Sequence, residues 1–343
     1  MMSVANLTET PLVSIVIPAY NQRETLRRGL LALAQQDCPA GVFEVVVADD
    51  GSTDNTGEMV SNLTVLYRLN YQWQPNRGRS AVRNFGVQHT EGKLLIFLDG
   101  DMCPTPSLVS QHLESLIRYG PGVMVKGAIR LPPELNKTPF TRLYLSKFDS
   151  AESDIEYSLH FGECATGNLS LWKEDFVRLG GFDEEFTAYG WEDVAFGYEA
   201  YRRGIKLLCN PKALAYHYDY ATDLARHCQR WRASARGAPQ VLLRKYPELR
   251  TAIALFRDMD PINWQRDDVM TVAKKGGRRL LSNPFLLRTL QSIVKVSERG
   301  LARSRILARL YQVIVGLYIY IGYREGWALV ARNTSASFAQ PGG

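Results

Sequence analysis

Residues 94–101 read Leu-Leu-Ile-Phe-Leu-Asp-Gly-Asp, five apolar side chains followed by the carboxylates Asp99 and Asp101. Five consecutive apolar residues predict a strand buried on both faces, as in the centre of a parallel sheet. Side chains two positions apart on an extended backbone project to the same side, so the two carboxylates can face one ligand. Carboxylates at the end of a central strand suit Mg²⁺ or Mn²⁺ held together with a phosphate-bearing molecule. An acidic turn is the alternative, and we favour the metal site.

Strand and helix patterns alternate on both sides of this stretch over the first 130 residues. The expected strands are Val13–Pro18, Phe43–Ala48, Thr64–Leu69 and Lys93–Leu98, and the expected helices are Asn21–Gln36 and Arg79–Gln88. This alternation predicts an α/β fold with a doubly wound, mostly parallel, Rossmann-like sheet. Right-handed crossovers then place the loops that carry Tyr20, Asp50 and Asp99 along one edge of that sheet.

The later part of the chain is less regular. Residues 131–163 are irregular and partly acidic, which favours a loop or a lid. We expect a helix over Trp191–Arg203, a short strand over Lys206–Cys209 and mostly helices after Asp223. The predicted domains are an α/β domain over residues 1–225, with halves at about 11–103 and 104–225, and a helical C-terminal extension over residues 226–343.

Charge is distributed unevenly along the chain. From Arg226 to the end there are 21 Lys and Arg against 7 Asp and Glu, which leaves 20 basic and 28 acidic residues before it. Such an asymmetry indicates a C-terminal region that meets an anionic partner, whether anionic lipid, nucleic acid or a phosphorylated acceptor. Because no nucleic-acid-binding signature accompanies the basic residues, we expect no nucleic acid.

The cysteines and the N-terminus bear on localisation. The five cysteines are scattered and never spaced as CxxC, which argues against a disulfide framework and a zinc site. The first ten residues have neither a basic nor an apolar segment of the kind that directs secretion. We therefore expect a cytoplasmic protein that can lie peripherally on the inner face of the membrane.

The longest apolar run is Leu310–Tyr323. Fourteen helical residues rise roughly 21 Å, less than the ~30 Å hydrocarbon core, so we expect no membrane span. Leu307, Leu310, Ile314, Leu317 and Ile321 form one apolar stripe preceded by several arginines. This pattern is typical of an interfacial helix on an anionic membrane, and equally of a helix packed on its own domain or on a second subunit. We favour packing, and both alternatives stay open.

Polar groups also follow the first two expected strands. Asp50, in the sequence Asp-Asp-Gly-Ser, could accept a hydrogen bond from a nucleobase N–H, and Tyr20 could cover the face of that base. An ordinary turn would have the same sequence. Arg79 and Arg83 lie four positions apart on one helix face and could meet a diphosphate, although solvated surface arginines would share that spacing.

Two further sites contain candidate catalytic or metal-binding side chains. Glu192 and Asp193 follow Gly190 and Trp191 at an expected helix start, where acids commonly cap exposed N–H groups. Their apolar neighbours also suggest a pocket in which one carboxylate is free to act as a base. His217 lies among tyrosines, and it is either a metal ligand or an ordinary packed histidine.

Taken in order, these motifs resemble the family-2 glycosyltransferases with the GT-A fold. The likeness covers roughly residues 11–220. Its motifs are Val-Ile-Pro-Ala-Tyr-Asn at 16–21, Asp-Asp-Gly-Ser-Thr-Asp at 49–54, Gly-Arg-Ser-Ala-Val-Arg-Asn at 78–84, Asp-Gly-Asp at 99–101, Gly-Asn at 167–168, Gly-Gly-Phe-Asp-Glu at 180–184 and Gly-Trp-Glu-Asp at 190–193. The last three are similar to the acceptor half of galactosyl- and N-acetylgalactosaminyltransferases and of chondroitin-type polymerases.

The resemblance implies roles for the donor-side residues. It implies that Asp50 binds uracil and that Pro18, Ala19, Tyr20 and Asn21 line the uridine pocket of a UDP-sugar. Asp99, Gly100 and Asp101 would form the motif that holds Mn²⁺ or Mg²⁺ on the diphosphate. Asp101 would be the direct ligand, and His217 would complete the metal shell. Arg79 and Arg83 would belong to the same donor site.

It also implies an acceptor site and a reaction. Asp193 would be the catalytic base, and Glu192 would hold hydroxyls of the acceptor or of the donor sugar. Asn168, Gly190 and Trp191 would lie at the acceptor, with Arg230, Trp231 and Arg232 at its border. The implied activity is metal-dependent transfer of a hexose-type sugar from a UDP-sugar to an acceptor hydroxyl on a glycan, a lipid-linked glycan or a small molecule. The Glu-Asp pair favours inversion at the anomeric carbon.

Three alternatives remain at this point. A retaining glycosyltransferase of the same fold would share these motifs. A non-catalytic protein that binds a nucleotide sugar or an anionic partner is a second, against which the full set of carboxylates argues. A sugar-nucleotide pyrophosphorylase would need a glycine-rich phosphate loop after the first strand, and residues 18–21 contain no glycine.

Overall fold

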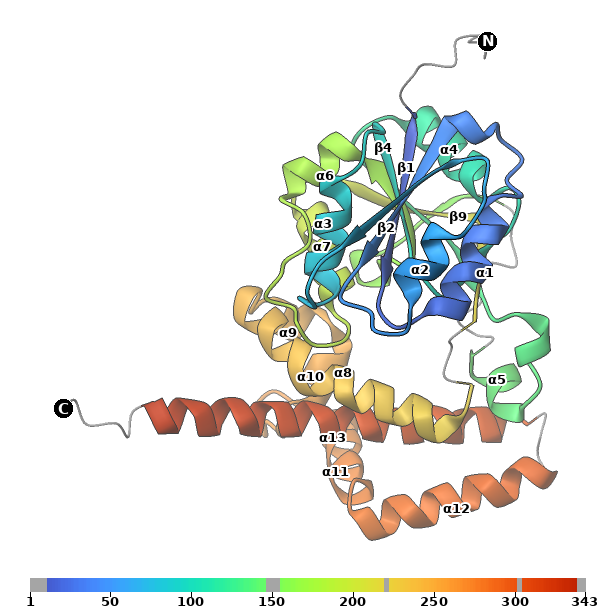
Figure 1. Cartoon of the computed structure of the whole chain (residues 1–343). Coiled ribbons are helices and arrows are strands. Elements are labelled where there is room, and N and C mark those ends of the chain that lie inside the picture. Colours follow the sequence, from blue (N-terminus) through green and yellow to red (C-terminus); the bar gives the residue numbers. More distant parts are fainter. Residues whose placement is uncertain (1–10, 146–154, 219–221, 301–303, 338–343) are drawn as a thin grey trace. The chain divides into compact units, whose positions relative to one another are not determined.

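The computed structural model describes residues 11–145, 155–218, 222–300 and 304–337 (Figure 1). Contacts within the chain divide it into two units. The first consists of Met1–Pro133, Phe148–Thr187 and Glu192–Tyr220. The second consists of Glu134–Lys147, Ala188–Trp191 and Ala221–Gly343. Glu134–Lys147, Ala188–Trp191 and the first residues after Ala221, all before the predicted boundary at residue 225, thus belong to the helical unit.

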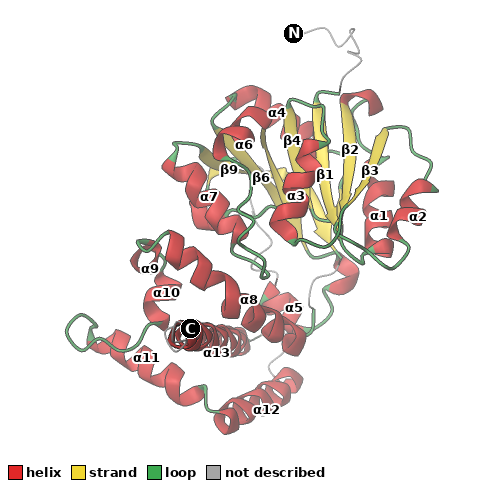
Figure 2. Ribbon diagram, turned by 60° about the vertical axis from the view of Figure 1, so that its left-hand side comes forward, coloured by secondary structure: helices red, strands yellow, loops and turns green. Residues whose placement is uncertain are grey.

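The first unit is built on one mixed sheet with helices on both faces (Figure 2). Its strands are β1 (Val13–Ala19), β2 (Phe43–Asp49), β3 (Arg68–Trp73), β4 (Leu94–Leu98), β5 (Met102–Pro104), β6 (Val123–Arg130), β7 (Tyr157–Ser158), β8 (Asn168–Trp172) and β9 (Lys206–His217). The order across the sheet is β3-β2-β1-β4-β8-β6-β9-β5, and β7 pairs with β9. Strands β1, β2, β3, β4, β6 and β9 run one way and the other described strands run against them, which confirms the α/β, mostly parallel fold.

Two apolar cores cover the two faces of this sheet, because alternate residues of each strand point to opposite faces. Ile15 and Val45 pack with α1 (Arg23–Leu33), α2 (Thr56–Ser61) and α4 (Leu108–Tyr119). Val16 and Phe97 pack on the other face. The helices of that face are α3 (Arg79–Gln88), α6 (Lys173–Leu179) and α7 (Glu192–Arg202). All five residues of β4 are buried, as the apolar run predicts.

Two strand predictions need correction. The third strand lies at Arg68–Trp73 rather than Thr64–Leu69, because its edge position leaves it half exposed and without a clear apolar run. Strand β9 extends to His217 instead of ending at Cys209. Its pairing with β6 shifts between Gly127 and Ala128, and the bulge accommodates Pro211, which has no N–H to donate to the ladder.

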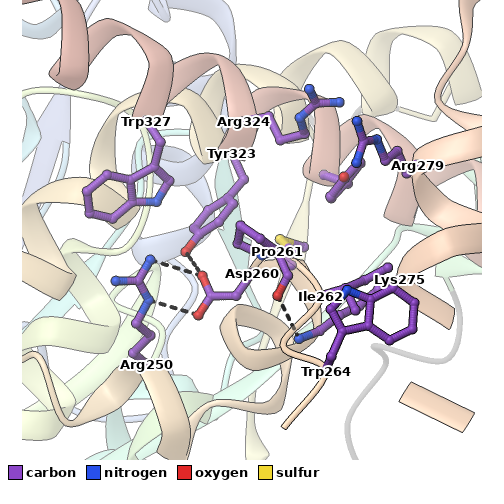
Figure 3. Close-up of a pocket in the computed structure, with 12 residues that line it drawn as sticks. Arg250, Asp260, Pro261, Ile262, Trp264, Lys275, Arg279, Tyr323, Arg324 and Trp327 are labelled. Atoms are coloured by element: carbon purple, nitrogen blue, oxygen red, sulfur yellow. Dashed lines mark hydrogen bonds and ion pairs between the residues drawn. The ribbon is translucent and has the colours of Figure 1, made fainter. Parts of the chain in front are cut away.

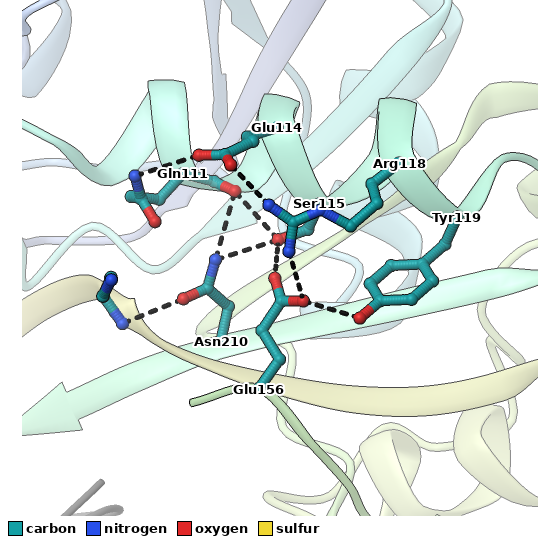
Figure 4. Close-up of polar contacts among 8 residues, drawn as sticks. Gln111, Glu114, Ser115, Arg118, Tyr119, Glu156 and Asn210 are labelled. Carbon is teal, nitrogen blue, oxygen red and sulfur yellow. Dashed lines mark hydrogen bonds and ion pairs between the residues drawn. The ribbon is translucent and has the colours of Figure 1, made fainter. Parts of the chain in front are cut away.

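The irregular segment at 131–163 contains short elements. These are the 3₁₀ helices Pro133–Leu135 and Phe161–Glu163, α5 (Pro139–Leu143) and β7. The middle of the expected loop or lid, residues 146–154, lies outside the described residues. Just after it, Glu156 accepts hydrogen bonds from Ser115, Arg118 and Tyr119 of α4, and Asn210 of β9 donates to Ser115 Oγ at 2.9 Å (Figure 4). This cluster fixes Glu156 to α4 of the first unit.

The second unit is helical. Besides α5, it contains α8 (Leu224–Lys245), α9 (Leu249–Ala252), α10 (Ala254–Met259), α11 (Val269–Leu281), α12 (Pro284–Gly300) and α13 (Arg305–Ser337). Helix α13 runs alongside α8 (Figure 1). Gly322 faces the carbonyl of Arg232 and Gly326 faces that of Arg236, so closely that a Cβ atom at either glycine would overlap α8. These two glycines allow the helix backbones to touch.

Helix α13 extends beyond both ends of the apolar run Leu310–Tyr323. Over Arg305–Arg332 the helix is long and apolar enough, by length and composition, to cross a membrane, and 56% of its most apolar window is buried within the structure. Leu307, Ile314 and Leu317 of the stripe are buried, and α13 contacts α5, α8, α11 and α12. Among the described residues this stripe therefore packs inside the second unit.

Candidate functional site

The loops after β1 and β2 are joined to each other at the carboxyl edge of the sheet. Asn21, at φ +51°, donates its backbone N–H to Ser52 Oγ at 2.9 Å and accepts from the Thr53 N–H through Oδ1 at 2.8 Å. Tyr20 is 51% exposed beside this junction, while Pro18 and Ala19 end β1. The structure therefore brings together the residues predicted to line a nucleotide pocket.

Asp50 accepts hydrogen bonds from the loop that precedes α3. Its Oδ1 accepts from Gln74 Nε2 and from the Arg77 N–H, both at 2.8 Å, and its Oδ2 accepts from the Gly78 N–H at 2.9 Å. The neighbouring Asp49, which has no predicted role, accepts from the Ser52 N–H and the Tyr71 hydroxyl. Both acids thus fix the loops after β2 and β3, and the contact of Asp50 with a nucleobase stays a prediction.

The loop after β4 lies against the loop after β1. A Cβ atom on Gly100 would be 2.9 Å from Gln22 Oε1 and 3.1 Å from the Pro18 carbonyl, so glycine allows this approach. Gln22 Nε2 in turn lies 3.5 Å from Asp101 Oδ2. At the same edge, the Asp99 N–H donates to the Gly167 carbonyl at 3.1 Å, next to the start of β8. Three loops from the donor-side half and one from the other half therefore meet here.

Arg83 lies at the centre of this edge and is only 2% exposed. Its guanidinium donates to Asp99 Oδ1 at 2.8 Å and to Glu192 Oε1 at 3.3 Å. The contact of Arg83 with a diphosphate stays a prediction; in the structure its side chain is buried and paired with the Asp99 and Glu192 carboxylates. Arg79, one turn earlier on α3, is exposed.

Arg83 and the carboxylates around it stabilise each other's charged forms. Burial alone would lower the pKa of Arg83, but the nearby Asp99, Asp193 and Glu192 carboxylates raise it above its ordinary value. Burial likewise acts to raise the pKa of Asp99, yet Arg83 and then Arg79 hold it below the ordinary value. Both partners therefore stay ionised, as a buried ion pair requires.

Asp193 has different surroundings. Burial of its carboxylate, followed by repulsion from Glu192, raises the pKa of Asp193 to about 7. Its Oδ1 accepts a hydrogen bond from Thr166 Oγ1 at 2.5 Å. Glu192 is 4% exposed, and its Oε2 has no hydrogen-bond partner within the described part of the chain. A carboxylate that titrates near neutral pH beside a fixed ion pair is suited to accept a proton.

Asp101 directly precedes β5 and His217 ends β9, and the pairing of these two strands brings them together. His217 Nε2 lies 3.0 Å from Asp101 Oδ2. Asp101 Oδ1 is buried and has no hydrogen-bond partner among the residues that the structure describes. No group of three or more His, Cys, Asp or Glu among those residues is placed to hold a metal. An oxygen and a nitrogen donor fit Mn²⁺ or Mg²⁺ only when a bound phosphate or water supplies further ligands.

The predicted acceptor residues have different surroundings. Asn168 has no exposed surface, and its amide contacts the Ala128 and Ala213 carbonyls and His112. Its assignment to the acceptor site stays a prediction; in the structure its amide connects β8 to β6 and β9. Within the second unit, Trp191 adopts φ +73° and its ring lies 4.7 Å from that of Phe256. Gly190 has φ +85° and faces Ser234.

The three residues expected at the border of the acceptor site have partners within the second unit. Trp231 Nε1 lies 2.9 Å from His227 Nε2, and Arg232 forms an ion pair with Glu325. Arg230 lies over the ring of Tyr189 at 4.9 Å. Sequence reasoning missed two residues of the first unit, Thr166 beside Asp193 and Gln22 beside Asp101. Neither differs in type from an ordinary loop residue, and each is recognised only through its contact.

Two protein-family models match this chain. Residues 14–174 match the family described as Glycosyl transferase family 2, and residues 146–221 match the N-terminal domain of galactosyltransferase. The chain is 33% identical over 227 residues to validoxylamine A glucosyltransferase of Streptomyces hygroscopicus subsp. jinggangensis, covering 58% of this chain and 54% of that one. It is 30% identical over 240 residues to chondroitin synthase of Escherichia coli, covering 60% and 34%. The alignments thus span about half or less of these relatives.

Solved structures show the same fold. A mannosyltransferase of Pyrobaculum calidifontis, in complex with GDP-Man and Mn²⁺, superposes with a TM-score of 0.53 at 18% identity, over 94% of this chain and 88% of that chain. Residues 1–349 of S. aureus TarS in complex with UDP superpose with a TM-score of 0.50 at 17% identity, over 92% and 91%. At these identities the likeness supports the GT-A fold alone.

Proposed function

We propose that the chain, whose residues 14–174 match the Glycosyl transferase family 2 model, transfers a hexose-type sugar from a UDP-sugar to an acceptor hydroxyl with inversion, with Asp193 as base. One observation carries the proposal. Arg83 joins Asp99, at the end of β4, to Glu192, at the start of α7, and so fixes Asp193 beside the loop that contains Asp101.

The proposed chemistry begins with a proton transfer to Asp193. As the acceptor oxygen bonds to the anomeric carbon, its proton passes to the Asp193 carboxylate and the bond from that carbon to the diphosphate oxygen breaks. Asp193 Oδ2 is the candidate proton acceptor, because Thr166 engages Oδ1. Attack from the face opposite the leaving group inverts the configuration. A retaining transferase of the same fold remains the alternative.

The leaving diphosphate needs its developing charge neutralised. Asp101 and His217 would hold Mn²⁺ or Mg²⁺, which when bound supplies Lewis acid stabilisation to the leaving oxygen. The Mn²⁺ in the complex of the Pyrobaculum mannosyltransferase supports the choice of metal. Arg79, which is exposed and close enough to act on the charge of Asp99, would contact the same diphosphate. Asp99 itself would act mainly through its pairing with Arg83.

For the donor we propose a UDP-sugar, with Asp50 and the loop that contains Pro18, Ala19, Tyr20 and Asn21 around the uridine. The UDP complex of TarS supports a uridine nucleotide as the donor. Because the mannosyltransferase was solved with GDP-Man, the experiment below also includes GDP-sugars. The acceptor would be a glycan, a lipid-linked glycan or a small molecule. The cationic region after Arg226 supports an anionic acceptor or a peripheral contact with an anionic membrane at the cytoplasmic face, and not nucleic acid.

The test is a nucleotide-release assay over panels of UDP- and GDP-sugars with Mn²⁺. We expect release with one donor class, reversible loss with EDTA, and loss of at least a hundredfold in Asp193→Asn. The matched control is Asp37→Asn, an exposed acid of the same unit, which should keep wild-type rates. Binding of UDP without turnover by any donor would favour a non-catalytic protein. Absence of all nucleotide binding would refute the proposal.

A further inference from the structure

A second concave site lies wholly within the helical unit, in residues outside both family matches. It is a pocket of about 650 Å³ formed by α9, the loop after α10, α11 and α13 (Figure 3). Small-molecule sites in proteins commonly occupy roughly 300–1,000 Å³. Its lining includes four cations, Arg250, Lys275, Arg279 and Arg324, against one acid, Asp260. An excess of positive charge in a concave site indicates an anionic ligand.

Two of the four cations hold the pocket wall together. Arg250 donates to both carboxylate oxygens of Asp260, at 2.8 and 3.0 Å, and the Tyr323 hydroxyl donates to the same carboxylate at 3.1 Å (Figure 3). Lys275 is 6% exposed and donates to Asp267 at 2.8 Å and to the Pro261 carbonyl at 3.3 Å. Asp260, the one acid among the described residues of the lining, is therefore already engaged and does not neutralise the remaining cations.

The other two cations are Arg279 of α11 and Arg324 of α13, on helices in contact with each other. Both are exposed, and within the described ranges no carboxylate lies within ion-pair distance of either. Arg324 lies over the ring of Tyr320 at 5.6 Å, which holds the guanidinium at the pocket without cancelling its charge. Two guanidinium groups at one pocket present forked N–H donors that match the oxygens of a phosphate.

Aromatic rings form much of the rest of the lining. Trp327 lies 5.2 Å from the Arg250 guanidinium and 6.2 Å from the Tyr323 ring. Trp264 is 79% exposed at the pocket. Rings beside cations suit a ligand with an anionic group and a less polar organic part. A dianion would neutralise both Arg279 and Arg324, whereas a single carboxylate would leave one of them uncompensated.

We propose that this pocket binds a phosphate ester, with the phosphate at Arg279 and Arg324 and the organic part against Trp264 and Tyr320. The phosphate can come from a soluble phosphomonoester or from a lipid whose headgroup is a phosphomonoester, such as phosphatidic acid, since both present a dianionic phosphate. The site is independent of the proposed transfer reaction, because it uses none of the residues assigned to that reaction.

The test uses the full chain and two probes. Glycerol 3-phosphate is titrated by calorimetry, and vesicles of phosphatidylcholine with phosphatidic acid are used in co-sedimentation. We expect the wild-type protein to bind at least one probe, and Arg279→Gln with Arg324→Gln to weaken that binding at least tenfold. Binding of glycerol 3-phosphate alone assigns the site to soluble esters, and binding of vesicles alone assigns it to a lipid headgroup.

The matched control is Arg288→Gln with Arg309→Gln, two exposed arginines of α12 and α13 that do not line the pocket. This pair removes the same charge and should change binding less than twofold. Equal weakening in both double variants would show a general charge effect and overturn the proposal. Wild-type binding by the pocket variant, or no binding of either probe, would also overturn it. Thermal melting of each variant verifies that it is folded.

Discussion

Arg83 Nη1 lies 3.3 Å from Glu192 Oε1, so a cation on α3 holds the acid that begins α7, 109 residues further along the chain. Both side chains are at most 3% exposed. A buried ion pair of this kind is costly to break from one side, because the remaining charge stays buried without a partner. The two helices are therefore fixed to each other through their charges.

Arg83→Met should consequently destabilise the first unit by about 3–5 kcal/mol, since Asp99 and Glu192 would both lose their cation. Urea unfolding monitored by circular dichroism measures this change. Arg27→Met, at an exposed position of α1, is the matched control and should change stability by less than about 0.5 kcal/mol. Equal stability of the two variants would contradict the assignment of Arg83 as the central cation.

Protonation of Asp193 should slow the transfer reaction at acidic pH. Its pKa is raised to about 7, so the carboxyl group is protonated below that pH and free to accept a proton above it. The value of kcat/KM should therefore rise with pH through about 7 and level off above it. A profile that stays flat from pH 6 to pH 8, measured with saturating metal, would exclude Asp193 as the base.

His112 should make the fold sensitive to acid. Burial lowers the pKa of His112 to about 4, from about 6.5 in an unfolded chain, and its ring contacts Asn168 and Ser170. Between these two pH values the unfolded chain binds the proton and the native protein does not. Stability should thus fall by up to about 3 kcal/mol as the pH drops from 6.5 to 4.

Urea unfolding at pH 7.5 and pH 5 measures the contribution of His112. The variant His112→Gln cannot titrate, so its loss of stability between the two pH values should be smaller than that of the wild-type protein. Replacement of the exposed His160 by Gln is the control, because a side chain in water gains little from folding. Identical pH dependence of the wild-type protein and His112→Gln would contradict this prediction.

Asp101 and His217 should determine metal affinity. In the presence of UDP, Asp101→Ala should weaken Mn²⁺ binding at least tenfold, as measured by electron paramagnetic resonance of free Mn²⁺. His217→Gln should weaken it less, because the amide oxygen can still coordinate. Asp37→Asn should bind Mn²⁺ like the wild-type protein. Unchanged affinity in Asp101→Ala would assign the metal to other residues.

Gly326 should not tolerate a methyl group. A Cβ atom there would overlap the Arg236 carbonyl of α8, so Gly326→Ala should destabilise the second unit by about 1–3 kcal/mol. Gly316→Ala on the same helix meets no atom within 4 Å and should stabilise it by about 0.5–1 kcal/mol. Thermal unfolding of both variants measures the difference, and a stabilising Gly326→Ala would contradict the close packing.

Sequence patterns predicted the parts of the fold that depend on local chemistry. The apolar run before Asp99 predicts β4, and the bounds expected for α3, Arg79–Gln88, agree with the structure. Sequence patterns did not predict the features that depend on tertiary contacts. Because proline usually ends a strand, Pro211 made the predicted strand too short, whereas β9 continues to His217. The spacing of Arg79 and Arg83 could not show that only Arg83 is buried. The pairing of Asp101 with His217 needed the sheet, because 116 residues separate them.

Strand β4 owes its central position to a partner that follows much later in the chain, since Leu98 pairs with Asn168 of β8. During synthesis, 70 residues must be added after Leu98 before that partner exists, which takes roughly 4–14 seconds at ordinary translation rates. Throughout that interval a fully apolar strand presents an unpaired edge, the kind of surface that recruits other chains. Aggregation of the nascent chain is therefore a hazard inherent in this topology, and a fragment that ends before β8 would retain it permanently.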